Sequence, residues 1–171
     1  GKIGIEVDET EDISRKLAVV DKSGKYKFLL VRPADVPVYV EYGAADIGVA
    51  GKDILIEYSS PVAELLDLKF GFCELVVAGN KSDKFTPEKY YPKIKVATKF
   101  VNSAESYCSK YGIKVDIIKL YGSVELGPIT GLADLIVDLT ATGTTLKENG
   151  LEIVDTVYGT SARLIANSVK I

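Results

Sequence analysis

The sequence predicts an α/β protein built from two α/β lobes. Short apolar runs of strand length alternate with segments of helical periodicity, and this β-α-β rhythm favours a mainly parallel sheet. A fresh apolar strand begins after Gly71 and runs into a polar stretch at 79–84, so a lobe boundary is expected near residue 71. With 171 residues, 47% of them hydrophobic, the chain has enough apolar side chains for two such cores.

Glycine and proline mark out the elements of the first lobe. The apolar run at 27–31 ends at Arg32 and Pro33, as a buried strand does when it leaves its sheet. Apolar residues at helical spacing then stop at Gly43, and Asp53 is placed to cap a further helix. The expected elements are a strand at 27–31, a helix at 35–42, a strand at 47–50 and a helix at 53–58.

The second lobe has the same α/β character. Strands are expected at 74–78, 95–98, 115–120 and 135–139, with helices at 102–111 and 124–132 between them. Closing strands are expected at 154–157 and 163–166, and one of them crosses back to the first lobe. We therefore assign residues 1–71 to the first lobe, together with the returning segment 159–171, and residues 72–158 to the second.

Composition excludes several classes of partner. The 21 basic and 24 acidic residues nearly balance and no basic cluster occurs, which argues against a nucleic-acid surface. No apolar run approaches the roughly 20 residues that a bilayer span needs, so no membrane partner is expected. No charged-then-apolar leader precedes Gly1, and we expect a cytoplasmic protein.

The chain contains no histidine, which removes the commonest general base and the commonest transition-metal ligand. Its chemistry must use carboxylates, hydroxyls, lysine or arginine, backbone amides or a hard cation. Cys73 and Cys108 lack the spacing of a zinc site or a redox motif, and we expect two buried free thiols. The chain also has no methionine, even at position 1, so we expect the natural protein to extend further.

The segment 135–150 carries the strongest chemical signal. A buried strand runs into a Thr/Gly turn and then a helix, and the backbone amides of such a turn can surround a phosphate with help from the helix dipole. Asp138, at the end of the strand, repels a phosphate but suits ribose hydroxyls or Mg²⁺. The alternative is that the threonines only cap the helix and that Asp138 is a turn residue. The turn consists of Thr140, Ala141, Thr142, Gly143, Thr144 and Thr145.

Three further segments place ligand-type residues where strands open into helices. Arg32 could clamp a pyrophosphate, or form a salt bridge with Asp35. Gly51 allows the backbone to approach a ligand beside Lys52, although tight packing would explain the same glycine. Glu125 follows a strand and a turn, where it could contact a ligand, although an acid in the first turn of a helix also has a structural role through the helix dipole.

Taken together, these segments resemble the ATP phosphoribosyltransferase family. The matches keep the family's order over nearly all of residues 12–167, and they are highly specific only in combination. They are RPADVP at 32–37, YGAADIGVAGKD at 42–53, GSVEL at 122–126, GLAD at 131–134, and 138–146.

The resemblance implies a particular fold, reaction and site. The fold has two α/β lobes with a central cleft, similar to type II periplasmic binding proteins. The reaction joins ATP to phosphoribosyl pyrophosphate in the first step of histidine biosynthesis, with Mg²⁺. The loop 140–145 would bind the sugar 5-phosphate and Asp138 the ribose hydroxyls. Arg15 and Arg32 would bind pyrophosphate or ATP phosphates, and Glu125, Gly51 and Lys52 would be further cleft contacts.

Two departures from the family pattern qualify this resemblance. Family members begin with a strand that ends in Pro-Lys-Gly-Arg, and they continue beyond the position of Ile171; we expect both pieces to be missing from this sequence. The chain resembles the short form, which assembles as a homodimer within a hetero-oligomer with a regulatory subunit similar to histidyl-tRNA synthetase. A non-catalytic two-lobed solute-binding protein and an inactive regulatory subunit remain the rival interpretations.

Overall fold

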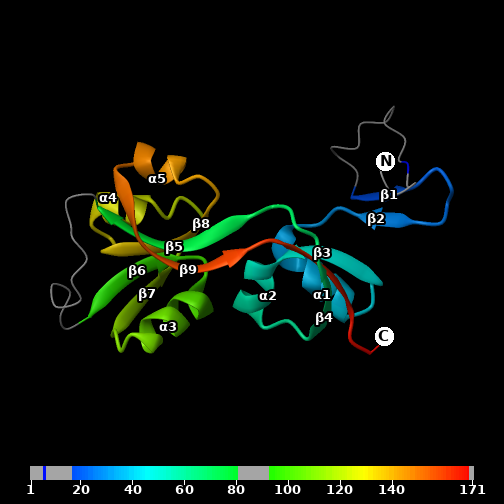
Figure 1. The fold of residues 1–171 in the computed structure, drawn as a ribbon, viewed down its shortest axis with the longest axis horizontal. Coiled ribbons are helices and arrows are strands. Elements are labelled where there is room, and N and C mark those ends of the chain that lie inside the picture. Colours follow the sequence, from blue (N-terminus) through cyan, green and yellow to red (C-terminus); the bar gives the residue numbers. More distant parts are fainter. Residues whose placement is uncertain (1–5, 7–16, 81–92, 170–171) are drawn as a thin grey trace.

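The computed structural model describes residue 6 and residues 17–80 and 93–169, and it arranges them around two separate main sheets (Figure 1). Within these ranges the strands form a two-stranded hairpin, a three-stranded sheet and a five-stranded sheet. None of the helices in this part of the chain reaches the length and hydrophobicity of a bilayer-spanning segment.

The three-stranded sheet is antiparallel throughout. Its central strand is β10 (Ala162–Asn167), which pairs with β3 (Ile47–Gly51) on one side and β4 (Val62–Asp67) on the other. A 3-10 turn, η2 (Pro33–Asp35), leads into α1 (Val36–Glu41), which packs on this sheet. A Cβ atom on Gly48 would lie 2.8 Å from side-chain atoms of Val36 and Val40, so the close approach of α1 to β3 requires glycine there.

The five-stranded sheet is mixed, with the order β7-β6-β8-β5-β9. The strand β6 is parallel to both of its neighbours, β7 and β8, whereas β5 is antiparallel to β8 and to β9. The strand bounds are β5 (Cys73–Asn80), β6 (Ile94–Thr98), β7 (Val115–Lys119), β8 (Leu135–Thr140) and β9 (Leu151–Thr160).

Helices cover both faces of the five-stranded sheet. Figure 1 shows α3 (Val101–Lys110) on one face, and α4 (Leu126–Thr130) with α5 (Thr144–Glu148) on the other. Leu75 and Val77 of β5 contribute to the core on the α3 side, while Val76 and Ala78 contribute to the core on the opposite side. A strand that is covered on both faces has no polar alternation, which is why β5 appears in the sequence as a continuous apolar run.

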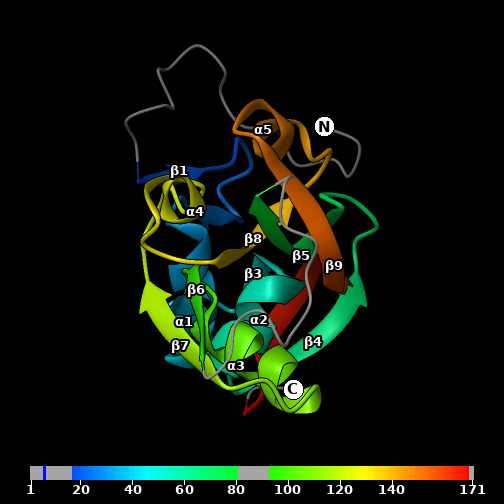
Figure 2. The ribbon, with the colours of Figure 1, turned by 90° about the vertical axis from the view of Figure 1, so that its left-hand side faces the viewer.

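The chain connects the two main sheets twice, between β4 and β5 and between β9 and β10 (Figure 1). The second of these connections leads into β10, which pairs with β3 and β4 of the three-stranded sheet. The helix α2 (Lys52–Tyr58) follows β3 and contacts α3, and both Figures 1 and 2 place these two helices side by side.

Several sequence predictions need correction. The sheets are not mainly parallel, because β5 and β9 run antiparallel to their neighbours. The same holds for every strand of the three-stranded sheet, hereafter the smaller sheet. Residues 27–31 are not a buried strand: β2 (Lys27–Leu29) forms a largely exposed hairpin with β1 (Ala18–Val20). Its turn is held by Asp21, whose carboxylate accepts hydrogen bonds from the amides of Ser23 and Tyr26.

Other elements differ at their ends or were not predicted. The strand β4 was missed because its acidic residues interrupt the apolar pattern. The helix expected at 124–132 is shorter: α4 begins at Leu126, and Glu125 occupies its N-cap position. Asp53 lies inside the first turn of α2 and does not cap it. Both cysteines are free as predicted, although only Cys108 is buried.

Candidate active site in the cleft between the sheets

The parallel part of the five-stranded sheet creates a favourable place for a ligand. The chain leaves β6 to form β7 on one side and returns to form β8 on the other, so the strand order reverses at β6. In open α/β sheets, ligands bind outside the carboxyl ends of the strands at such a reversal. The turn 140–145, Asp138 and Lys99 all lie at this carboxyl edge.

The turn after β8 holds its shape through its own hydroxyls. The amide of Gly143 donates to Thr140 Oγ1 at 2.7 Å, and the hydroxyls of Thr142 and Thr144 lie 2.9 Å apart. Gly143 has a φ of 72°, a conformation that other residues adopt only with strain. These contacts and the left-handed conformation of Gly143 define the backbone conformation of the turn. Gly143, and not a threonine, occupies the N-cap position of α5.

This geometry suits an anion. The first amides of a helix have no partner four residues earlier, so those of Thr145 and Leu146 are directed out of the first turn of α5. Since α5 has only five residues, its dipole is small and the attraction for an anion must come chiefly from these backbone amides and the neighbouring hydroxyls. No threonine occupies the N-cap position of α5, which belongs to Gly143.

Asp138 sits beside this turn with an unusual environment. Its Oδ1 is buried and has no hydrogen-bond partner among the described residues, although Lys99 Nζ approaches it to 3.8 Å. Burial raises the pKa of Asp138, and the negative charge of Glu125 adds to that shift, while Lys99 and the Leu139 amide oppose it. A buried carboxylate oxygen without a donor is costly unless a ligand hydroxyl satisfies it.

Lys99 was not singled out from the sequence, although a signal for it exists. It follows β6 at the carboxyl edge of the sheet, the same position that pointed to Asp138 on β8. Its ammonium group also lies 4.9 Å from the centre of the Phe100 ring. Glu125 is half-buried and lies at the N-cap position of α4, not in its first turn, and it makes no side-chain capping bond there.

The remaining predicted residues lie with the smaller sheet. Arg32 is exposed at the start of η2 and forms no ion pair with another described residue, so the alternative of a salt bridge to Asp35 is not observed. The backbone carbonyl of Arg32 accepts a hydrogen bond from the Asp35 amide at 2.9 Å. Lys52 forms an ion pair with Glu64. A Cβ atom on Gly51 would collide with the Asp53 carboxylate, which supports tight packing at that glycine. Arg15 lies outside the described residues.

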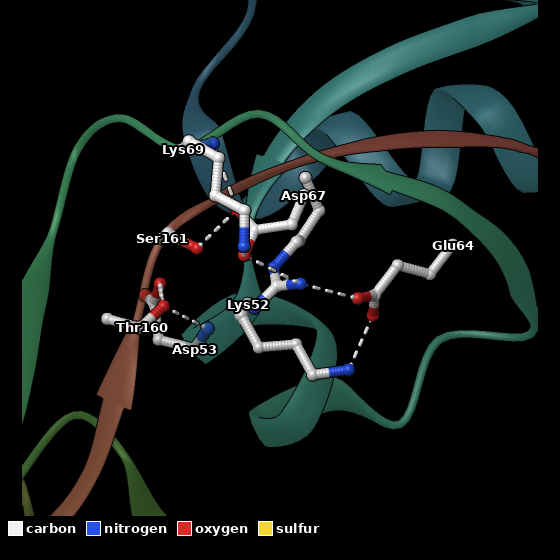
Figure 3. A network of polar contacts seen from close by, with 8 residues as sticks. Lys52, Asp53, Glu64, Asp67, Lys69, Thr160 and Ser161 are labelled. Carbon is white, nitrogen blue, oxygen red and sulfur yellow. Dashed lines mark hydrogen bonds and ion pairs between the residues drawn. The ribbon is translucent and has the colours of Figure 1, made fainter.

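Lys52 belongs to a polar network that links the smaller sheet to the crossing strand, by which we mean β9 at the point where it passes into β10 (Figure 3). Asp67 accepts hydrogen bonds from the Ser161 hydroxyl at 2.9 Å and from the Lys69 amide at 2.9 Å. These bonds lower the pKa of Asp67, the Lys69 contacts most of all. Arg163, on β10, lies 3.4 Å from the same carboxylate and was not anticipated from the sequence.

A pocket of about 430 Å³ lies where the chain crosses between the sheets. The pocket brings Ala141 of the turn 140–145 together with residues of the smaller sheet and of the two connections, β4 to β5 and β9 to β10. Arg163 lines it, and the buried Nε of that side chain has no hydrogen-bond partner among the described residues. The lining residues are Asp67, Phe72, Cys73, Glu74, Ala141, Gly159, Thr160, Ser161 and Arg163.

The structure thus groups some predicted residues and separates others. Asp138, Glu125 and the turn 140–145 gather at one edge of the five-stranded sheet, with Ala141 facing the pocket. Arg32, Gly51 and Lys52 stand on elements of the other sheet. An arrangement of this kind can hold one substrate by its phosphate on one side and a second substrate from the other side.

Comparison with solved structures agrees with this two-sided architecture. The holo form of ArgBP from Thermotoga maritima superimposes with a TM-score of 0.54 at 16% identity, covering 91% of this chain and 79% of that one. A likeness at this identity concerns the fold alone. It confirms two α/β lobes similar to type II periplasmic binding proteins.

Closer relatives carry one functional description. The ATP phosphoribosyltransferase of Caldanaerobacter subterraneus subsp. tengcongensis is 54% identical over 168 residues, which are 97% of this chain and 78% of that protein. A solved chain of the ATP phosphoribosyl transferase (HisG:HisZ) complex from Thermotoga maritima has a TM-score of 0.80 at 39% identity, covering 91% of this chain and 74% of that one. The family profile described as HisG, ATP phosphoribosyltransferase, matches residues 32–171. The chain therefore belongs to the ATP phosphoribosyltransferase family.

Proposed function

We propose that the cleft catalyses attack of the adenine N1 of ATP on C1 of phosphoribosyl pyrophosphate. A C–N bond forms, the C–O bond to the leaving pyrophosphate breaks, and the products are N1-(5-phosphoribosyl)-ATP and pyrophosphate. The observation that carries this assignment to the cleft is the buried Oδ1 of Asp138 beside the turn 140–145, which accepts no hydrogen bond from the described residues. A sugar hydroxyl would supply the missing donor, with its 5-phosphate on the turn.

The residues at the five-stranded sheet would hold the phosphoribosyl group. The backbone of Ala141, Thr142, Gly143, Thr144 and Thr145 would bind the 5-phosphate, while Thr140 shapes the turn through its bond to the Gly143 amide. Asp138 would accept hydrogen bonds from the ribose hydroxyls and stabilise the positive charge that develops on the ring as the leaving group departs.

The other side of the cleft would hold ATP and the leaving group. Arg32, exposed and without an ion pair among the described residues, is free to bind pyrophosphate or ATP phosphates. We assign the same role to Arg15. Glu125, Gly51 and Lys52 are proposed as further contacts, and Lys52 would have to exchange its ion pair with Glu64 for a substrate phosphate. No covalent nucleophile is required, which suits a chain without histidine.

Enzymes of this family need a divalent metal ion, and we propose that it is Mg²⁺. Within the described residues no three acidic or cysteine side chains form a cluster of the kind that holds a metal by protein ligands alone. A cleft with few carboxylates and bound substrate phosphates suits Mg²⁺, which commonly keeps several waters and is held by substrate phosphates with one or two carboxylates. When bound, the ion would neutralise charge on the leaving pyrophosphate.

The assembly and lobe boundaries are also proposals. The related Thermotoga maritima chain comes from a HisG:HisZ complex, and we propose a homodimer of this chain within a hetero-oligomer that includes a histidyl-tRNA synthetase-like regulatory subunit, in the cytoplasm. Sheet membership supports a division into 1–71 with 159–171, and 72–158, since β10 pairs with β3 and β4.

The proposed function is tested by pyrophosphate release from the full-length chain with its partner. Release should require both ATP and phosphoribosyl pyrophosphate, and omission of either substrate provides the control. Tight capture of an amino acid with no release of pyrophosphate would instead favour a solute-binding protein.

A further inference from the structure

Glu57, near the end of α2, makes a contact that joins the two sheets. Its side chain is only 3% exposed. The carboxylate accepts hydrogen bonds from the amides of Asn102 and Ser103, at 2.9 and 3.0 Å, and from the Ser103 hydroxyl at 2.9 Å. Asn102 and Ser103 lie in the first turn of α3, on the five-stranded sheet, whereas α2 follows a strand of the smaller sheet.

The contact supplies α3 with the cap that its own sequence lacks. The first amides of a helix have no intrahelical partner, and Phe100, at the N-cap position of α3, provides no side-chain bond. Glu57 satisfies two of these amides with a charged acceptor, which makes stronger hydrogen bonds than a neutral one. Asn102 Nδ2 reciprocates by donating to the Glu57 carbonyl at 2.7 Å.

The contact is also connected to the crossing strand. The Ser103 hydroxyl lies 3.0 Å from the hydroxyl of Tyr158 on β9, close to the point where the chain passes to the smaller sheet. Burial raises the pKa of Tyr158, so this hydroxyl keeps its proton at neutral pH.

The other end of α2 is anchored as well. The Asp53 amide donates to Thr160 Oγ1 at 3.0 Å, and the same hydroxyl lies 3.1 Å from Asp53 Oδ1 (Figure 3). The Lys52 amide donates to the Ser161 carbonyl at 3.0 Å. The helix α2 is thus fixed at its first turn to the crossing strand and at its last turn to α3, and it can set the angle between the sheets.

We propose that Glu57 is a positioning residue for phosphoribosyl transfer. By capping α3 from the opposite side, it holds the element that carries Arg32 at a set separation from Asp138 and the turn 140–145. This inference rests on the proposed function, because two substrates held on opposite sides react only when both sides are aligned. Glu57 itself need not touch either substrate.

The test compares Glu57→Ala with Glu105→Ala in the full-length chain with its partner. Glu57 lies on α2, whereas Glu105 is exposed on α3, the helix that Glu57 caps, so Glu105→Ala also removes one negative charge but leaves the contact intact. Misalignment of the two sides should lower the kcat of Glu57→Ala by roughly 10- to 100-fold. The KM for phosphoribosyl pyrophosphate should change less than kcat, since the 5-phosphate site lies on one side only. Glu57→Gln, which keeps one acceptor, should recover part of the loss.

Sulfate affinity of the turn 140–145, measured by calorimetry, separates positioning from general damage. Sulfate should bind Glu57→Ala and wild type alike. Equal kcat for folded Glu57→Ala and Glu105→Ala would overturn the proposal, as would a loss of kcat matched by a loss of sulfate binding. If Glu57→Ala does not fold, Ser103→Ala removes one of the three bonds, and wild-type kcat in that variant would overturn the proposal too. Absence of turnover in wild type would instead contradict the proposed function.

Discussion

At the scale of single residues, Asp138 combines two properties that oppose each other. Burial disfavours its charged form, and Glu125 adds repulsion, yet the proposed ribose contact needs a good hydrogen-bond acceptor. Lys99, 3.8 Å away, offsets part of this cost. Such a conflict between local stability and ligand binding is typical of functional sites.

The first prediction concerns the function of Asp138. Asp138→Asn keeps the size of the side chain and one acceptor but removes the charge. We expect kcat/KM for phosphoribosyl pyrophosphate to fall by about 10-fold or more, or ~1.4 kcal/mol, while the fold survives. Asp116→Asn is a suitable control, because Asp116 is a partly exposed carboxylate on β7 that pairs with Lys93. Wild-type kinetics in folded Asp138→Asn would assign Asp138 a structural role.

The second prediction concerns stability and pH. Because the folded-state pKa of Asp138 lies above its ordinary value of 3.8, the folded chain binds more protons than the unfolded chain between the two values. Asp138 therefore lowers the free energy of unfolding as pH rises through this window. Asp138→Asn should unfold at a higher temperature than wild type near neutral pH, and the difference should shrink toward pH 3.8. Thermal unfolding across pH measures this, and a pH-independent difference would contradict it.

At the scale of elements, the turn between β8 and α5 depends on Gly143. A Cβ atom there would meet only Ile153 Cδ1, at 3.7 Å, so space inside the protein is not the constraint. The constraint is the φ of 72°, together with the approach of a phosphate to the backbone. The turn is therefore sensitive to backbone strain and to obstruction of its outer surface.

The third prediction uses two glycines at opposite ends of α5. Gly143→Val should cost about 1–2 kcal/mol through its left-handed backbone and should also abolish sulfate binding at the turn. Gly150 has the same φ of 72° and open space around it, so Gly150→Val matches the strain but leaves the turn untouched. Sulfate titration of both variants distinguishes the two effects. If both lose sulfate equally, or if crystals show anions elsewhere and an empty turn, the phosphate assignment is wrong.

At the scale of the whole molecule, two sheets share one pocket at their crossing segments. Each sheet has its own core, so a change in the angle between them would open or close the pocket without disturbing either core. A partner that favours one angle would change activity through the population of aligned molecules.

The fourth prediction concerns such a partner. We expect the chain to release pyrophosphate faster when a histidyl-tRNA synthetase-like subunit is present, and we expect histidine to inhibit only the complex. Feedback inhibition requires a histidine site distinct from the cleft, which we place on that subunit. The measurement is pyrophosphate release with and without the partner over a histidine titration. A chain that is fully active alone and inhibited by histidine at its own site would contradict the short-form assignment.

The sequence alone was sufficient to determine the family and the fold class, and it predicted a phosphate-binding role for the turn 140–145. The fold class and the strand, turn and helix around Asp138 were predicted because apolar periodicity and glycine act within a few residues of the chain. The helix preceding Gly43 was predicted for the same reason, and α1 ends two residues before it.

Only the tertiary structure decided which distant segments meet. Apolar periodicity specifies which face of a strand is buried, but not which strand lies beside it or in which direction that strand runs. The antiparallel pairing of β5 with β8, and of β10 with β3, could therefore not be anticipated. Lys99 and Asp138 are 39 residues apart, and Glu57 and Asn102 are 45 residues apart. Such contacts depend on the path of the whole chain between two sheets, which no local pattern of residues encodes.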